Sequence, residues 1–291
     1  MSKLVITILL FVVGTPWVAF SQAAVKGDKK YDWYVKEYPF LEGLQLIYSM
    51  DTEFPLPEGY KKIDPSSLNS FQRWVTELPL SQKNKPVYTY GKGVKLKVGQ
   101  FSRRIQYRWR TVYFTNAVLP LQLLAEFLHD HRQDHRVEFK PKKGEVLTYM
   151  NWLNKEVLFD RMGNLTYGKV QKKEASEEEF GRFCEILATN TTYGSLKENC
   201  EELAEDKLAP GDLFIALDST GREGDVYVIL DILVNDRNEK LYLVGTGCPE
   251  ACDFYIPLFN DNPDNPWITL DQLKALAGEY TDVGFYRMKY R

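Results

Sequence analysis

The side chains of this chain that could perform chemistry are mostly acidic and gather in its C-terminal third, at the ends of apolar segments. Two arginines upstream could join them, because a guanidinium group binds a carboxylate or phosphate through paired hydrogen bonds. We treat this set as a candidate cleft. Its members are Arg108, Arg110, Asp212, Asp225, Asp231 and Thr246.

Structural roles compete with this interpretation. Arg108 could neutralise a buried acid such as Asp212, and we favour that role. The acids Asp218, Asp225 and Asp231 do not have the spacing of a calcium loop. No glycine-rich phosphate-binding motif is present either. We therefore expect neither a metal nor a cofactor.

All three histidines lie within residues 129–135. On a helix, His131 and His135 would share one face, as zinc ligands do. The alternative is a solvated helix end, where cationic histidine suits the negative pole of the helix dipole. The charged neighbours favour the second interpretation.

The chain has four cysteines. Cys248 and Cys252 lie close together in one expected loop, and we predict a disulfide between them. Cys184 falls on the apolar face of an expected helix, which is typical of a core residue or one half of a bridge. Cys184 or Cys200 could instead be the nucleophile of a hydrolase, an interpretation we do not favour.

Aromatic residues suggest a possible ligand class. Tyr149, Trp152, Tyr255 and Trp267 could line a groove for sugar rings, although aromatic residues more often fill a core. The partner class to consider is thus a cell-wall glycan or peptide, with no particular ligand indicated.

The N-terminus has the layout of a cleavable signal peptide. Lys3 precedes an apolar run, Leu4–Val13, that is too short to cross a bilayer, and Ala19 and Ser21 fit the positions that signal peptidase inspects. We predict a signal peptide over residues 1–21, an arm over 22–51 and one domain over 52–291. The mature protein is expected in the periplasm or secreted, an oxidising setting that permits disulfides.

Charge and hydropathy narrow the function classes. The net charge of the full chain is −3, and removal of Lys3 with the signal peptide makes it −4. Nucleic-acid binding usually needs a basic surface, so we expect no nucleic-acid partner. No segment after the signal peptide is apolar for long enough to span a membrane.

Hydrophobic periodicity predicts an α+β fold, with a helical middle region packed on a C-terminal antiparallel meander. Helices are expected over 67–78, over 101–113 and after two capping boxes, Ser176 with Glu179 and Ser195 with Glu198. Val94, Leu96 and Val98 alternate as in a half-buried strand. Strands are expected over 212–217, 225–234, 240–246, 254–258 and 283–288, with a last helix capped by Thr269 and Gln272.

Several blocks, in order, resemble one bacterial family from about Thr52 to the end of the chain. The blocks are Phe54-Pro-Leu-Pro-Glu-Gly-Tyr60, Ser70-Phe71 with Trp74, Leu78-Pro-Leu80, Arg108 and Arg110 with Tyr113, Pro210-Gly-Asp-Leu-Phe-Ile215, Val228-Ile-Leu-Asp231 and Leu241–Val244. They are similar to Domain of Unknown Function 4846, a family of uncharacterised exported proteins. The resemblance supplies a class and no activity.

The family's Gly-Asp strand and following Gly-His strand are similar to the strand half of papain-like cell-wall hydrolases. In such enzymes a helix carries a nucleophilic Cys, a strand carries a His base, and a polar group on the next strand orients the imidazole. Here Gly224-Asp225 stands where the Gly-His pair is expected, and Gly245 stands where the orienting residue is expected. An Asp is a weak base near neutrality.

These departures favour a non-catalytic binding or structural protein on a hydrolase-like scaffold. The alternative is a cell-wall amidase or peptidase whose catalytic residues the sequence does not reveal.

Overall fold

The computed structural model describes residues 48–90, 93–106, 114–259 and 262–290. The expected signal peptide, most of the expected arm, and Arg108 and Arg110 therefore lie outside the described residues. Within the described ranges, no helix is long and apolar enough to cross a membrane.

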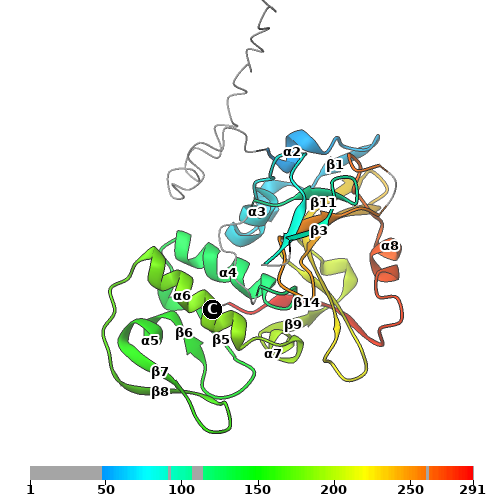
Figure 1. The fold of residues 1–291 in the computed structure, drawn as a ribbon. Helices are drawn as coiled ribbons and strands as arrows, with labels where there is room; N and C mark the ends of the chain where they lie inside the picture. The colour runs from blue at the N-terminus through cyan, green and yellow to red at the C-terminus, as the bar shows by residue number, and fades with distance from the viewer. Residues whose placement is uncertain (1–47, 91–92, 107–113, 260–261, 291) are drawn as a thin grey trace, which may run out of the picture.

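An antiparallel sheet dominates the molecule (Figure 1). The strands β10 (Leu213–Leu217), β11 (Gly224–Asn235), β12 (Lys240–Thr246) and β13 (Tyr255–Pro257) pair with their sequence neighbours. This confirms the predicted meander and the α+β class. The closing strand β14 (Asp282–Met288) returns to the other side of β10. Three further strands complete the sheet: β4 (Phe101–Arg104) beside β13, β9 (Cys200–Leu203) beside β14, and β1 (Tyr60–Lys62) on the far half of β11.

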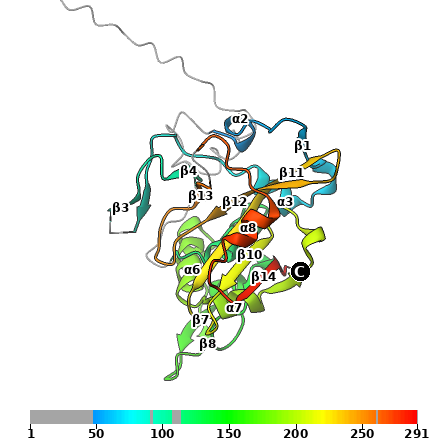
Figure 2. The ribbon, with the colours of Figure 1, turned by 90° about the vertical axis from the view of Figure 1, so that its right-hand side faces the viewer.

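Helices cover both faces of this sheet (Figures 1 and 2). Alternate residues of β10 and β11, such as Leu213 and Val226, belong to the larger core, which also contains α3 (Ser70–Thr76), α4 (Leu119–Asp130) and α6 (Glu177–Thr189). The intervening residues, such as Phe214 and Ile229, pack against α8 (Leu270–Ala275) in a second core. Side chains alternate between the two faces of a strand, so β10 and β11 are apolar on both faces.

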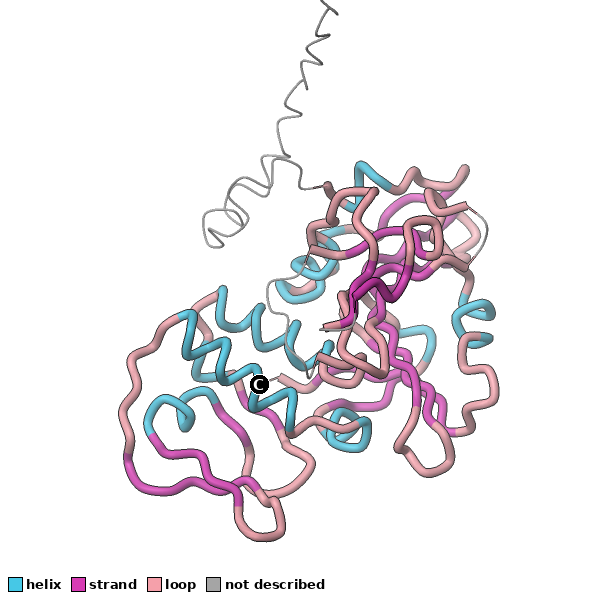
Figure 3. The backbone as a smooth tube through the Cα atoms, in the orientation of Figure 1, coloured by secondary structure: helices cyan, strands magenta, loops and turns pink. Residues whose placement is uncertain are grey.

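Small elements fill the rest of the described chain (Figure 3). They are the helices α2 (Met50–Glu53), α5 (Tyr149–Asn154) and α7 (Tyr193–Glu198), the 3-10 turns Pro65–Ser67, Asp134–Arg136 and Glu205–Lys207, and the pairs β2 (Val87–Thr89) with β3 (Gly93–Leu96), β5 (Glu138–Phe139) with β6 (Leu147–Thr148), and β7 (Lys155–Phe159) with β8 (Leu165–Val170).

Capping residues account for three helix starts. The Ser176 hydroxyl accepts from the backbone N–H of Glu179, and Thr269 and Gln272 form the full predicted capping box of α8. The second predicted box is wrong. Thr192 caps α7, and Ser195 is the third residue inside that helix, where its hydroxyl accepts from the Thr192 N–H. A Ser or Thr three residues earlier competes for the cap, so the helix starts one turn sooner than predicted.

Two predictions in the first half are wrong. Residues 101–104 form a strand, although apolar residues at 101 and 105 suggested a helix; a spacing of four also fits alternate positions of a strand. The remainder of that expected helix, 107–113, lies outside the described residues. Val94 is about half exposed because β3 pairs with β2 away from the main sheet, and Val98 lies in the turn after β3. The helix expected from 67 begins at Ser70, capped by Asn69.

Candidate functional site

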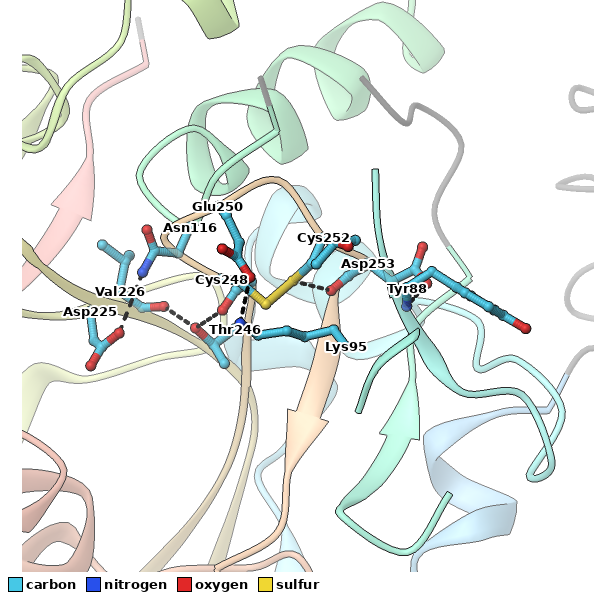
Figure 4. The surroundings of a disulfide bond; sticks show 12 residues. Tyr88, Lys95, Asn116, Asp225, Val226, Thr246, Cys248, Glu250, Cys252 and Asp253 are labelled. Atoms are coloured by element: carbon cyan, nitrogen blue, oxygen red, sulfur yellow. Dashed lines mark hydrogen bonds and ion pairs between the residues drawn. A yellow bond between two sulfur atoms is a disulfide. The ribbon is translucent and has the colours of Figure 1, made fainter. Parts of the chain in front are cut away.

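The side chain of Asn116 bridges two strand ends at one end of the sheet (Figure 4). Its backbone N–H donates to the Cys248 carbonyl at 2.8 Å, just after β12, and its side-chain amide donates to the Gly224 carbonyl at 3.1 Å, at the start of β11. Asn116 thus hydrogen-bonds to both chain segments at the point where β11 and β12 no longer pair with each other. Its side chain is fully buried, so each of these bonds offsets a desolvation cost.

The phenol of Tyr193, the first residue of α7, completes the junction. Its oxygen lies 2.8 Å from the Asn116 side-chain carbonyl and 2.7 Å from the Gly224 carbonyl, and its proton can be donated to either. Burial raises the pKa of Tyr193 to about 12, so the phenol remains a neutral donor at physiological pH. Hydrogen bonds at Gly224 therefore connect helix α7, the segment before α4 and strand β11.

Asp225 lies next to this junction, and its carboxylate is 3.5 Å from the Asn116 side-chain nitrogen. The residue is half-buried. Burial raises the pKa of Asp225 above its ordinary value. No lysine, arginine or histidine of the described residues forms an ion pair with this carboxylate. Asp225 is therefore a partly desolvated acid that has no cationic partner among the described residues.

A row of side chains crosses the sheet beside Asp225. Tyr227 shares the face of Asp225, because it lies two residues further along β11. In the register of the sheet, Tyr227 is directly opposite Thr246, and Thr246 is directly opposite Tyr255. On the other side Tyr227 is opposite Phe214, with ring centroids 6.2 Å apart. Phe214 and Tyr227 pack in the core that contains α8, whereas Tyr255 packs against Phe101 and the disulfide.

The negative charge of Asp225 affects both half-buried tyrosines of this row, Tyr227 and Tyr255. Burial, and then the negative charge of Asp225, raise the pKa of Tyr255 to about 12. The same two causes raise the pKa of Tyr227. Burial, and then the negative charges of Asp225, Glu223 and Asp218, also raise the pKa of Tyr280, which lies just before β14. The surroundings of Asp225 are thus aromatic and negatively charged.

Thr246 lies in this row but does not offer its hydroxyl to Asp225. The hydroxyl donates to the Val226 carbonyl at 2.7 Å, and only 4 % of the residue is exposed. Gly245, which the sequence suggested as the position of an orienting residue, is opposite Val228 and so points to the other face of the sheet. Thr246 is the β12 residue that shares a face with Asp225.

The predicted disulfide is confirmed, and it borders the site (Figure 4). Cys248 and Cys252 are bonded with their Cα atoms 5.7 Å apart. The loop that they close provides the carbonyl group that receives the Asn116 N–H. An ion pair between Lys95 and Glu250 joins the same loop to strand β3.

Asp212, the next member of the expected cleft, has a structural contact. Two parallel hydrogen bonds of 2.7 Å join its carboxylate to Arg287, and the backbone N–H of Ala209 adds a third at 2.8 Å. The partner that the sequence suggested, Arg108, lies outside the described residues. Because Asp212 carries no exposed oxygen and already has a bidentate partner, it is not available to a ligand.

Asp231 is also structural. A bulge in β11 between Ile229 and Asp231 turns the acid to the side of the larger core, where Lys62 binds it at 2.6 Å and its own neighbour Ile232 donates a backbone N–H. Asp225 is opposite Ala216, whereas Asp212 bonds to Ile229 four residues further along β11, roughly 13 Å away at the strand rise. Among the members of the candidate cleft that the structure describes, Asp225 and Thr246 are the two that lie together.

Other sequence candidates have internal contacts. His129 stacks on Phe180 and hydrogen-bonds to Asp134. His131 lies at the end of α4, where a ring nitrogen hydrogen-bonds to the Phe127 carbonyl, whereas His135 lies in a separate 3-10 turn. His131 and His135 therefore do not share a helix face. The described residues contain no group of metal-binding side chains. Cys184 and Cys200 are buried thiols that form no disulfide, and burial raises the pKa of Cys200 to about 12, against a nucleophilic role.

Three of the four aromatic residues proposed for a sugar groove belong to the core instead. Tyr149, Trp152 and Trp267 are at most 8 % exposed. Tyr255 remains, in the row beside Asp225.

Most of the described chain matches one protein family. The family is described as Domain of unknown function (4846), and its model matches residues 50–289. The chain belongs to this family. No curated protein and no solved structure matches it. The family resemblance seen in the sequence is therefore confirmed, and the function must be argued from the site.

Sequence reasoning missed Asn116 and Tyr193. Neither lies in a motif, and each matters only because folding brings it to Gly224, 108 and 31 residues away in the chain. The one available signal was Asn116 itself, a polar residue directly before a long apolar segment.

Proposed function

We propose that this protein is an exported, non-catalytic binding protein of the bacterial cell envelope, built on a hydrolase-like scaffold, and that its ligand site is the Asp225 end of the sheet. A cell-wall glycan or peptide is the ligand class we propose. The family it belongs to carries no established activity, so the proposal depends on the site.

The observation that carries the proposal is the set of polar side chains at this end. Asn116 precedes α4, Asp225 starts β11 and Thr246 ends β12. A papain-like hydrolase uses the same three kinds of element for its nucleophile, its base and its orienting group. Here the helix start offers an amide, which is not a nucleophile, and its hydrogen bonds hold the backbone together.

The neighbouring hydroxyl groups are also committed to structure. Thr246 donates to a backbone carbonyl, and the high pKa of Tyr193 prevents it from acting as a nucleophilic phenolate near neutral pH. What remains accessible is a carboxylate beside half-buried tyrosines. Such a surface suits binding.

Export is supported by the disulfide, since such bonds persist in oxidising compartments. We propose that the mature chain begins at or near Gln22 and is periplasmic or secreted. N-terminal sequencing of the protein recovered from a soluble envelope fraction tests this. Recovery of a chain that still begins at Met1 from membranes would refute it.

The site itself is tested by cosedimentation of the purified protein with isolated cell-wall sacculi. We expect the wild type to sediment with the sacculi and Asp225→Ala to remain in the supernatant. Asp236→Ala is the matched control, because this acid is 94 % exposed on a turn remote from the site. Equal sedimentation of all three proteins, or of none, would refute a wall-binding site at Asp225.

One observation favours the amidase or peptidase alternative. Burial raises the pKa of Asp225, which is the direction that a carboxylate needs in order to act as a general base near neutral pH. A turnover measurement on muropeptides separates the two functions, because only an enzyme would cleave them.

A further inference from the structure

The negative charge of Asp225 is not balanced within the described protein. Its hydrogen-bond contact is the Asn116 amide, at the long distance of 3.5 Å. The nearby acids Glu223 and Asp218 add to the negative potential around Tyr280. Clefts and surfaces with one sign of charge concentrate ligands of the opposite sign.

The side chains beside the carboxylate suit a particular kind of cation. Tyr227 and Tyr255 lie in the cross-strand row, separated by Thr246, and both are half-buried with part of each residue accessible. Directly opposed residues on neighbouring strands are about 5 Å apart, so both tyrosines are within a few strand spacings of Asp225. Aromatic rings beside a carboxylate favour an organic ammonium group, which the rings attract by cation–π interaction and the acid by charge.

Other ligand chemistries fit less well. A calcium or magnesium ion needs six or more oxygen ligands, and the described residues at this site supply one accessible carboxylate. A neutral sugar could hydrogen-bond to the tyrosine hydroxyls but would leave the charge of Asp225 unbalanced. The amide of Asn116 and the hydroxyl of Thr246 are already engaged by backbone carbonyls.

We infer that Asp225, Tyr227 and Tyr255 form a binding site for an ammonium group carried by the ligand, such as the free amino group of a cell-wall peptide or amino sugar. This inference rests on the proposed function and specifies its ligand.

Pairs of small probes that differ in charge but not in shape test the inference. The cations are choline and n-butylammonium, and their neutral counterparts are 3,3-dimethyl-1-butanol and n-butanol. Binding is followed by two-dimensional NMR titration of the full mature chain, at low and at high salt. We expect at least one cation to bind in the millimolar range, with weaker binding at high salt and at least tenfold weaker binding of its neutral counterpart.

Variants locate the site. Asp225→Asn should weaken cation binding at least tenfold. Tyr255→Leu should weaken it and Tyr255→Phe should retain it, because the ring and not the hydroxyl attracts the cation. Tyr242→Phe is the control, a buried tyrosine of the same face further along β12. Thermal melts confirm that each variant is folded.

The result that overturns the inference is equal binding of charged and neutral probes, binding that survives Asp225→Asn, or no binding of either cation. If cation binding fails but cosedimentation with sacculi still depends on Asp225, the proposed wall-binding function holds and the ligand is neutral. If cation binding and Asp225-dependent cosedimentation both fail, the proposed function and the proposed ligand are both refuted.

Discussion

Asn116 and Asp225 lie 3.5 Å apart although 109 residues separate them in the chain. The contact joins the segment before α4 to the start of strand β11. Papain-like enzymes take their nucleophile and base from a helix and a strand of this kind. In this protein the pair is an amide and a carboxylate. Neither side chain offers the thiol or hydroxyl nucleophile that such enzymes use.

The first prediction concerns the pH dependence of stability. The folded state binds the Asp225 proton more tightly than the unfolded state, because burial raises the pKa of Asp225 above 3.8. The contribution of Asp225 to the free energy of unfolding should therefore fall as pH rises from 3.8 through the raised pKa, and this deficit should persist at higher pH. Asp225→Asn, which resembles the protonated acid, should be at least as stable as the wild type at pH 7. Its advantage should vanish below about pH 4.

Urea unfolding of both proteins between pH 3 and pH 8 measures this difference. An Asp225→Asn protein that is less stable at pH 7 but not at pH 4 would contradict the prediction, since it would mean that the folded state prefers the ionised acid.

The second prediction concerns the Asp212–Arg287 pair. Arg287→Met should lower the free energy of unfolding by about 3 kcal/mol, because it leaves a buried carboxylate without its bidentate partner. We place the effect at the lower end of the range for buried pairs because the Arg287 side chain is 31 % exposed. Lys274→Met is the control, since its pair with Glu205 is about half exposed on both sides and should matter by less than about 1 kcal/mol. Equal effects in urea titrations would show that Asp212 does not depend on Arg287.

The third prediction concerns the junction at Gly224. Asn116→Ala removes a buried amide and leaves the Gly224 carbonyl with the Tyr193 hydroxyl as its remaining side-chain donor. We expect a loss of about 1–3 kcal/mol, and about 1 kcal/mol for Tyr193→Phe. The double variant should lose less than the sum, because the two side chains contact each other. Strict additivity in urea unfolding would show that they do not act together.

The fourth prediction concerns thiols. Under denaturing, non-reducing conditions two cysteines, Cys184 and Cys200, should react with a thiol reagent, and four should react after reduction. Replacing Cys248 and Cys252 together by Ala should cost about 2 kcal/mol, the entropic value for so short a closed loop. Labelling of all four cysteines without reduction, counted by intact mass, would show that the bridge does not form in the exported protein.

The C-terminal half of the fold was predictable from sequence because its strands are continuous apolar runs separated by clear turns. The turn after β11 is an example: Asn235 accepts backbone N–H groups from Arg237 and Glu239. Residues 101–104 were not predictable in the same way, since a spacing of four between apolar residues fits both a helix and alternate strand positions.

The site was predictable in part. Asp225 could be singled out because Gly224-Asp225 stands where the family resemblance places a Gly-His pair. The separation of Asp212 and Asp231 from it depends on strand register and on a bulge, neither of which leaves a pattern in one sequence. Asn116 acts through contacts with residues far along the chain, so its role becomes visible only in the folded molecule.

The central claim, that this site binds and does not catalyse, is tested most directly by mass spectrometry of defined muropeptides incubated with the purified mature protein, with Asp225→Asn in parallel. The account predicts that every muropeptide mass is unchanged in both incubations, while the wild type still sediments with sacculi. Pairs of fragments whose masses sum to that of a muropeptide plus one water, present with the wild type and absent with Asp225→Asn, would contradict it. Such fragments would identify Asp225 as the base of a working hydrolase.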